Sequence, residues 1–337
     1  MEITHVPLIK FFLEASVVIA TFFTVGIAAS EEPPPCPQCI ADFAIYNPSY
    51  EDDGVWEEEV TALEHMFKVF NWTYRSVDQI EINTGILASG PQRKFRALIA
   101  PGGWSWYREE AVTENGEKNL RAFVENGGHF VGFCAGAYWA AKRLVFAMNA
   151  SGKNNTYSTP EDFNGVYPYE LALYPGDAKG PLGWMPWKNG TNVNFSAAII
   201  NLENKNMRRI GLPKESRFLY GGGPFFPNAE KVPGMEVWAR AKSNITAQTA
   251  ATGEGQATIV HFPSGKGSVT LFSYHPDVLI KHQADGIALK QFFDEDAIKW
   301  DLGSQTYEQI NLDSWNIVHA ALQIAADQEV TALKKLP

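Results

Sequence analysis

Cysteine is scarce in this sequence, with three among its 337 residues. Cys36 and Cys39 form a CxxC pair, but no second CxxC and no histidine pair at zinc spacing accompany it. A metal site is therefore not indicated. Internal repeats and coiled-coil heptads are also missing, so the sequence favours a single domain and gives no sign of an oligomeric state.

Positive charge is in deficit as well. The chain has 28 Lys and Arg against 38 Asp and Glu, a formal net charge of −10, and its basic residues do not cluster. A surface that binds nucleic acid or an anionic membrane carries a positive patch. We therefore expect neither nucleic acid nor a membrane surface as a partner.

A mostly apolar run, FFLEASVVIATFFTVGIAAS, follows Lys10 near the start of the chain and ends in small residues. This pattern is typical of a secretory signal peptide, which we place at residues 1–30 with cleavage between Ala28 and Ser30 or close by. Glu2 and Glu14 are unusual in such a peptide. An uncleaved N-terminal membrane anchor is therefore the alternative.

Six N-glycosylation sequons support export, because this density indicates a surface that meets the glycosylation machinery. Their asparagines are Asn71, Asn149, Asn154, Asn189, Asn194 and Asn244. We expect a secreted protein with N-linked glycans, not held to a membrane after cleavage, whose mature domain covers residues 31–337.

An odd number of cysteines in an exported chain leaves one thiol unpaired. Cys36 and Cys39 are close enough for a small-loop disulfide, although a redox-active or metal-binding CxxC is the alternative. The disulfide leaves Cys134 free. A free thiol in an oxidising compartment calls for a reason, and catalysis is one.

Short apolar segments alternate with amphipathic helical segments, which predicts a parallel sheet with helices on both faces. The first half has expected strands at residues 41–46, 72–77, 95–100 and 130–133, and expected helices at 55–70, 116–126 and from 137 to 144. Residues 149–190 form an expected loop insertion. The second half has expected strands at 194–202, 218–220, 235–241, 257–262 and 267–274, with a hairpin turn in FPSGKGS and a helix over 307–335.

Cys134 stands at the expected strand-to-helix turn, in the frame Gly132-Phe133-Cys134-Ala135-Gly136. A nucleophile elbow has glycine on both flanks, because its sharp turn leaves no room for side chains there. The sulfur would then be exposed at the end of a strand. A buried structural cysteine in a glycine-rich turn is the alternative.

Two further segments follow expected strands. Gly102 and Gly103 follow residues 95–100, where backbone N–H groups could form an oxyanion hole together with that of Ala135. His275 and Asp277 follow residues 267–274, where a histidine can take a thiol proton and a carboxylate can orient its ring. Each segment alone is explained equally well by an ordinary turn.

In this order the three segments resemble class I glutamine amidotransferase-like proteins. GFCAGAYWAA, ELALYPGDAKGP and FLYGGGPFF further resemble the N-terminal domain of biotin–protein ligases. The resemblance runs from about Ala41 to Asp277. It implies a flavodoxin-like, mostly parallel α/β fold with loop and β insertions in the second half, and a triad of Cys134, His275 and Asp277. No GRGR-type biotin loop occurs, so biotin transfer is not implied.

The triad predicts an amide or peptide hydrolase, or an acyl transferase, that works through a thioester on a small molecule or peptide and needs no cofactor. Amidotransferases usually carry glutamine where this chain has Tyr138, which makes glutamine a doubtful substrate. A γ-glutamyl hydrolase-like activity is the most concrete version. A non-catalytic small-molecule or peptide binding module on the same fold is the rival.

Several other residues are candidates near the site. Trp104 and Tyr138 are expected to line a substrate pocket, and Gly222 and Gly223 to bring backbone close to it. Asp177 is a reserve acid. Two further histidines, His129 and His261, are expected to be packed or at the surface rather than catalytic.

Overall fold

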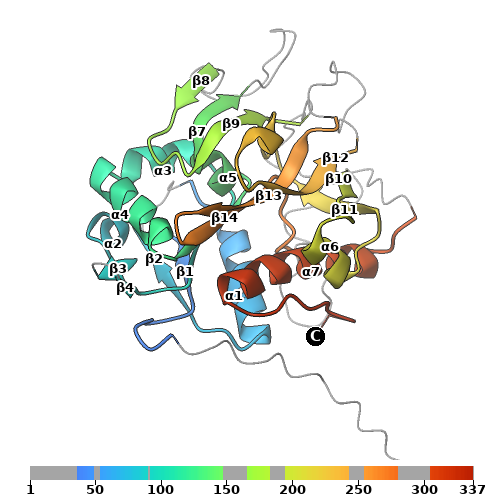
Figure 1. Ribbon diagram of the computed structural model, residues 1–337, viewed down its shortest axis with the longest axis horizontal. Coiled ribbons are helices and arrows are strands. Elements are labelled where there is room, and N and C mark those ends of the chain that lie inside the picture. The colour runs from blue at the N-terminus through green and yellow to red at the C-terminus, as the bar shows by residue number, and fades with distance from the viewer. Residues whose placement is uncertain are drawn as a thin grey trace, which may run out of the picture. The chain divides into compact units, whose positions relative to one another are not determined.

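The apolar segments expected to be buried strands lie side by side in a nine-stranded sheet of the computed structural model (Figure 1). The structure describes residues 36–48, 54–89, 92–146, 165–182, 194–242, 254–279 and 304–336. In spatial order the strands of this sheet are β11 (Glu215–Tyr220), β10 (Asn194–Ile200), β12 (Glu236–Ala241), β13 (Ala257–Ser264), β14 (Gly267–Phe272), β6 (His129–Phe133), β5 (Ala97–Ala100), β1 (Phe43–Tyr46) and β2 (Tyr74–Val77).

One half of the sheet is parallel. Strands β2, β1, β5, β6 and β14 are parallel neighbours, in the order of flavodoxin-like sheets. Strands β13, β12, β10 and β11 extend the sheet antiparallel, and all four precede β14 in the chain. The expected flavodoxin-like α/β fold with β insertions in the second half is therefore confirmed.

Helices cover both faces of the sheet because successive strand side chains point to opposite sides. In β1, Phe43 and Ile45 pack in one core with α1, α6 and α7, whereas Ala44 and Tyr46 pack in the other with α2, α4 and α5. The helices are α1 (Glu57–Val69), α2 (Gln79–Asn83), α3 (Ser105–Ala111), α4 (Glu114–Glu125), α5 (Ala135–Trp139), α6 (Lys205–Ile210) and α7 (Tyr307–Ala325), with a 3₁₀ turn η2 (Ala229–Lys231).

Two smaller sheets lie outside the central one. Strands β8 (Gly165–Pro168), β7 (Ala141–Phe146) and β9 (Tyr174–Gly180) form the first, and β3 (Ala88–Ser89) and β4 (Gln92–Arg93) form the second. The expected helix over 137–144 was wrong, because α5 ends at Trp139 and β7 follows. The β-branched and aromatic side chains of Val145 and Phe146 favour a strand that pairs with both β8 and β9.

The other second-half expectations hold in part. The hairpin is confirmed: Ser264 and Gly267 pair across it, with Gly265 in the left-handed region at φ 60°. Helix α7 ends at Ala325, shorter than expected, because the Asn316 and Gln323 side chains accept from backbone N–H groups of the returning tail. Within the described ranges, no helix combines the length and apolarity that crossing a bilayer requires.

Candidate active site

Cys134 occupies a strained turn between β6 and α5. Its φ of 44° lies in the left-handed region, which non-glycine residues rarely adopt. A Cβ on Gly132 would lie 2.8 Å from the Gly136 backbone, and one on Gly136 would lie 2.1 Å from the Ala100 carbonyl oxygen. Both flanking glycines are therefore required by close backbone approach, as in a nucleophile elbow.

Strand register brings His275 to the same edge of the sheet. Strands β6 and β14 are parallel neighbours with Phe133 opposite Phe272, so the residues that follow them are close together. The backbone N–H of Cys134 donates to the Phe272 carbonyl at 2.8 Å, and His275 is only 2% exposed. Burial lowers the pKa of His275, but interactions with Cys134 and the charge of Asp277 together outweigh burial, so the net shift is upward.

Glu59, which the sequence did not single out, contacts the other side of the imidazole. Its Oε1 lies 3.1 Å from His275 Nδ1, and its Oε2 accepts the backbone N–H of Gly102. With Nδ1 facing Glu59, Nε2 is the nitrogen left for the thiol. Glu59 is fully buried in α1, in phase with Leu63 and Met66 on the apolar face. The sequence feature that could have identified Glu59 is a glutamate on the apolar face of an amphipathic helix, where charged residues are rarely buried without a partner.

Asp277 completes a buried cluster with Glu59 and His275. Burial raises the pKa of Glu59 to about 8, and burial followed by the charge of Glu59 raises that of Asp277 well above its ordinary value. Two adjacent buried carboxylates repel each other, so the pair retains at least one proton near neutral pH. In the described part of the chain, these three side chains are also the group whose ligand atoms could hold a metal, within 4.8 Å of one another. Protons shared between the Glu59 and Asp277 carboxyl groups also explain why these side chains lie so close together.

Of the three backbone N–H groups expected to form an oxyanion hole, one is engaged in another hydrogen bond. The N–H of Gly102 donates to the Glu59 carboxylate, so it is already engaged and does not face the sulfur as a free donor. Gly103 lies opposite Val55 in an isolated antiparallel bridge. The two hydrogen bonds of this bridge are donated by the backbone N–H groups of Trp56 and Trp104, so the bridge does not use the N–H of Gly103. Ala135 is the first residue of α5, so its N–H has no acceptor within the helix.

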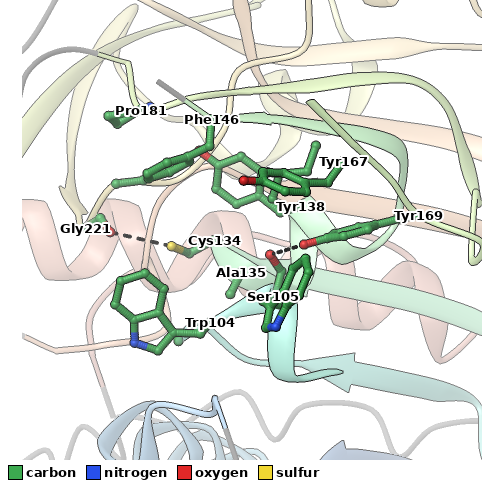
Figure 2. A pocket seen from close by; sticks show the side chains of 14 residues that line it. Trp104, Ser105, Cys134, Ala135, Tyr138, Phe146, Tyr167, Tyr169, Pro181 and Gly221 are labelled. Atoms are coloured by element: carbon green, nitrogen blue, oxygen red, sulfur yellow. Dashed lines mark hydrogen bonds between the residues drawn. The ribbon is translucent and has the colours of Figure 1, made fainter. Parts of the chain in front are cut away.

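A pocket opens beside the Cys134 sulfur (Figure 2). The sulfur lies 3.7 Å from the Gly221 carbonyl oxygen, to which the thiol donates weakly. The expected pocket residues Trp104, Tyr138 and Gly222 line it, but Gly223 does not. A Cβ on Gly223 would lie 2.0 Å from the Ser273 carbonyl oxygen, so this glycine serves close packing instead.

The reserve acid and the two other histidines lie in other contacts. Asp177 forms a bidentate ion pair with Arg143, at 2.7 and 2.8 Å, and is not part of the cluster. His129 Nδ1 lies 2.7 Å from the Ser268 hydroxyl, and His261 Nδ1 lies 2.9 Å from that of Thr270. These contacts explain Asp177, His129 and His261 as structural residues.

The cysteines and sequons are placed as far as the described ranges reach. Cys36 and Cys39 are joined in a disulfide with Cα atoms 5.3 Å apart, and Cys134 is a free thiol. Asn71 is exposed in the turn after α1, and Asn194 begins β10. The signal peptide and the sequons of Asn149, Asn154, Asn189 and Asn244 lie outside the described residues.

Comparison with known proteins adds a family. A family model described as "Biotin-protein ligase, N terminal" matches residues 49–335. A biotin–protein ligase from Schizosaccharomyces pombe is 24% identical over 181 residues, which cover 53% of this chain and 25% of the ligase. The chain thus spans about a quarter of the length of that relative.

Solved structures similar to the chain include a glutamine amidotransferase and a glutaminase domain. A glutamine amidotransferase from Thermotoga maritima is 14% identical with a TM-score of 0.42, over 85% of this chain and 97% of that one. The glutaminase domain of CTPS from Trypanosoma brucei is 11% identical with a TM-score of 0.44, over 88% of this chain and 98% of that one.

Proposed function

The chain belongs to the biotin–protein ligase N-terminal family, and from that premise we propose that it is a secreted, cysteine-dependent amide or peptide hydrolase or acyl transferase. The observation that carries the proposal is a strained elbow cysteine at the end of β6 beside β14, the parallel neighbour that leads into a buried histidine. A structural cysteine needs neither the positive φ nor the imidazole.

The proposed reaction runs through a thioester. The Cys134 sulfur attacks the substrate carbonyl carbon, and the thiol proton passes to His275. The carbonyl oxygen becomes an oxyanion that accepts from the N–H groups of Gly103 and Ala135. The bond to the leaving amine breaks as His275 protonates that amine. Water then cleaves the thioester to a free acid, or another nucleophile accepts the acyl group.

The two buried acids have different proposed parts. Glu59 faces Nδ1 directly and orients the ring, so that Nε2 is directed at the sulfur. Because the two acids retain at least one proton near neutral pH, Glu59 and Asp277 together offer at most one negative charge to the imidazolium that forms when the thiol proton is taken. Interaction with Asp277 is among the causes that raise the pKa of His275. Glu59 is thus a positioning residue for the His275 ring, and it comes from α1 rather than from the segment that carries His275.

Iodoacetamide tests the proposed nucleophile. At pH 6 an unperturbed thiol is ionised to only about 0.3%. We expect native Cys134 to be alkylated at least tenfold faster at this pH than the same cysteine in the urea-unfolded protein, because the imidazolium stabilises the thiolate. Mass spectrometry of the peptide containing Cys134 gives both rates. A native rate equal to or below the unfolded rate contradicts the proposal and favours the binding module.

Secretion is the second part of the proposal. It is supported by the N-terminal apolar run, by the Cys36–Cys39 disulfide and by the exposed position of Asn71. After expression of the full chain in a eukaryotic secretory host, we expect Asn71→Gln to remove one glycan from the protein in the medium, seen as a mobility shift. Thr73→Ser keeps the sequon and serves as the matched control. Intracellular, unglycosylated protein from both variants would contradict this proposal.

A further inference from the structure

Aromatic rings form the walls of the pocket beside Cys134, and they come from three separate parts of the chain (Figure 2). Trp104 and Trp106 belong to the start of α3, Tyr138 to α5, and Phe146 to β7. Tyr167 and Tyr169 come from β8 and the residue after it. Edge-to-face contacts fix the ring planes, with Trp106 and Tyr167 centroids 5.6 Å apart and Tyr138 and Phe146 centroids 5.8 Å apart.

Charge is absent from the described residues that line this pocket. Arg108, on the same helix as Trp106, donates instead to the backbone carbonyls of Gly54 and Gly102. A substrate ammonium or carboxylate entering these walls would lose its hydration without gaining an oppositely charged partner among the described lining residues, which is unfavourable. This disfavours free glutamine and γ-glutamyl compounds, both of which bring a charged α-carboxylate.

The polar side chains of the walls are largely engaged with the protein itself. The Ser105 and Tyr169 hydroxyls lie 3.0 Å apart, and the Tyr138 hydroxyl donates to the Gly222 carbonyl at 2.9 Å. A sugar stacked on these rings would need partners for several hydroxyl groups, and the walls offer few. Aromatic walls instead favour another uncharged ring, placed edge-to-face or offset-stacked.

We propose that the acyl part of the substrate carries an uncharged aromatic side chain, held between the rings of α3, α5 and β7 with its carbonyl carbon at the Cys134 sulfur. This inference rests on the proposed function, because it assigns the substrate class of the same thiol. It replaces the γ-glutamyl specificity expected from the sequence.

Chloromethyl ketones of N-acetylated phenylalanine, leucine and glutamate test this inference. In each probe the sulfur forms a bond to the methylene carbon, chloride leaves with the bonding electrons, and the thiol proton passes through His275 to solvent. Rates of Cys134 modification are followed by mass spectrometry and divided by the iodoacetamide rate of the same protein. We expect the phenylalanine ratio to exceed the glutamate ratio at least tenfold and the leucine ratio at least threefold.

Matched variants on one helix locate the selectivity. Trp106→Leu removes a pocket ring, and we expect it to lower the phenylalanine ratio at least fivefold. Tyr107→Leu changes the neighbouring aromatic residue, which is 39% exposed and does not line the pocket, and should leave the ratio unchanged. Thermal denaturation confirms that both variants are folded, and Trp106→Met, which also removes the ring, replaces Trp106→Leu if the latter is not.

The results separate the two proposals. Equal ratios for the three probes, in a protein whose Cys134 reacts rapidly with iodoacetamide, overturn the aromatic specificity and leave the nucleophile in place. A leucine ratio equal to that of phenylalanine also overturns the requirement for a ring. Slow reaction with iodoacetamide itself contradicts the proposed function before any selectivity is compared.

Discussion

Replacing His275 by alanine is expected to slow the iodoacetamide reaction of Cys134 roughly 30- to 100-fold at pH 6. Without His275 there is no imidazolium to stabilise the sulfur anion that attacks the reagent. At pH 10, where accessible thiols are ionised in both proteins, the two rates should agree within about threefold.

Convergence at high pH distinguishes lost ionisation from lost access. His261→Ala is the matched control, because this partly buried histidine contacts Thr270 on β14 and not Cys134. It should leave the rate at pH 6 unchanged. His275→Asn, which retains a polar side chain beside Glu59, replaces the alanine variant if that one does not fold. A variant lacking His275 that keeps the wild-type rate at pH 6 removes the histidine from the mechanism.

Replacing Glu59 by glutamine is expected to stabilise the protein increasingly as the pH rises. The pKa of Glu59 is about 8 in the folded protein against 4.5 for the free side chain, so the folded state holds a proton that the unfolded state releases. Wild-type stability therefore falls as the pH rises from about 4.5 to about 8. Glutamine does not titrate, and the stability difference should shift in favour of the variant by on the order of 4 kcal/mol across this window.

Urea unfolding at pH 5 and pH 8 measures that shift. The informative quantity is the change, between the two pH values, in the difference in unfolding free energy between variant and wild type. Any pH-independent effect of the substitution on stability cancels from it. Glu57→Gln is the matched control, because Glu57 lies two residues before Glu59 on α1 but is exposed to solvent, and it should show no such change. The same difference at both pH values would mean that Glu59 is ionised throughout and does not share protons with Asp277.

The elbow and the histidine were predictable because each depends on local sequence. Gly132 and Gly136 flank Cys134 for a steric reason that any strand-to-helix elbow imposes, and His275 follows a strand whose apolar pattern is evident. The parallel half of the sheet was predictable for the same reason, since buried strands and amphipathic helices alternate there.

The contact of Glu59 with His275 was not predictable from either segment alone. It depends on how α1 packs against the sheet edge, which brings together residues from opposite ends of the domain. The same packing uses the Gly102 N–H that sequence reasoning had assigned to an oxyanion. β7 was missed because its first residues are alanine and lysine, which suit a helix, while its partners β8 and β9 lie far along the chain.

The position of β14 has a consequence for how the protein can vary. Sulfur and imidazole are set by two adjacent strands, roughly 4.8 Å apart, whatever the length of chain that connects them. Insertions and deletions between Phe146 and β13 can therefore reshape the pocket walls without moving the nucleophile relative to its base. We expect relatives of this protein to differ in substrate through that segment and through the rings of α3, α5 and β7, a modular division between reactivity and selectivity.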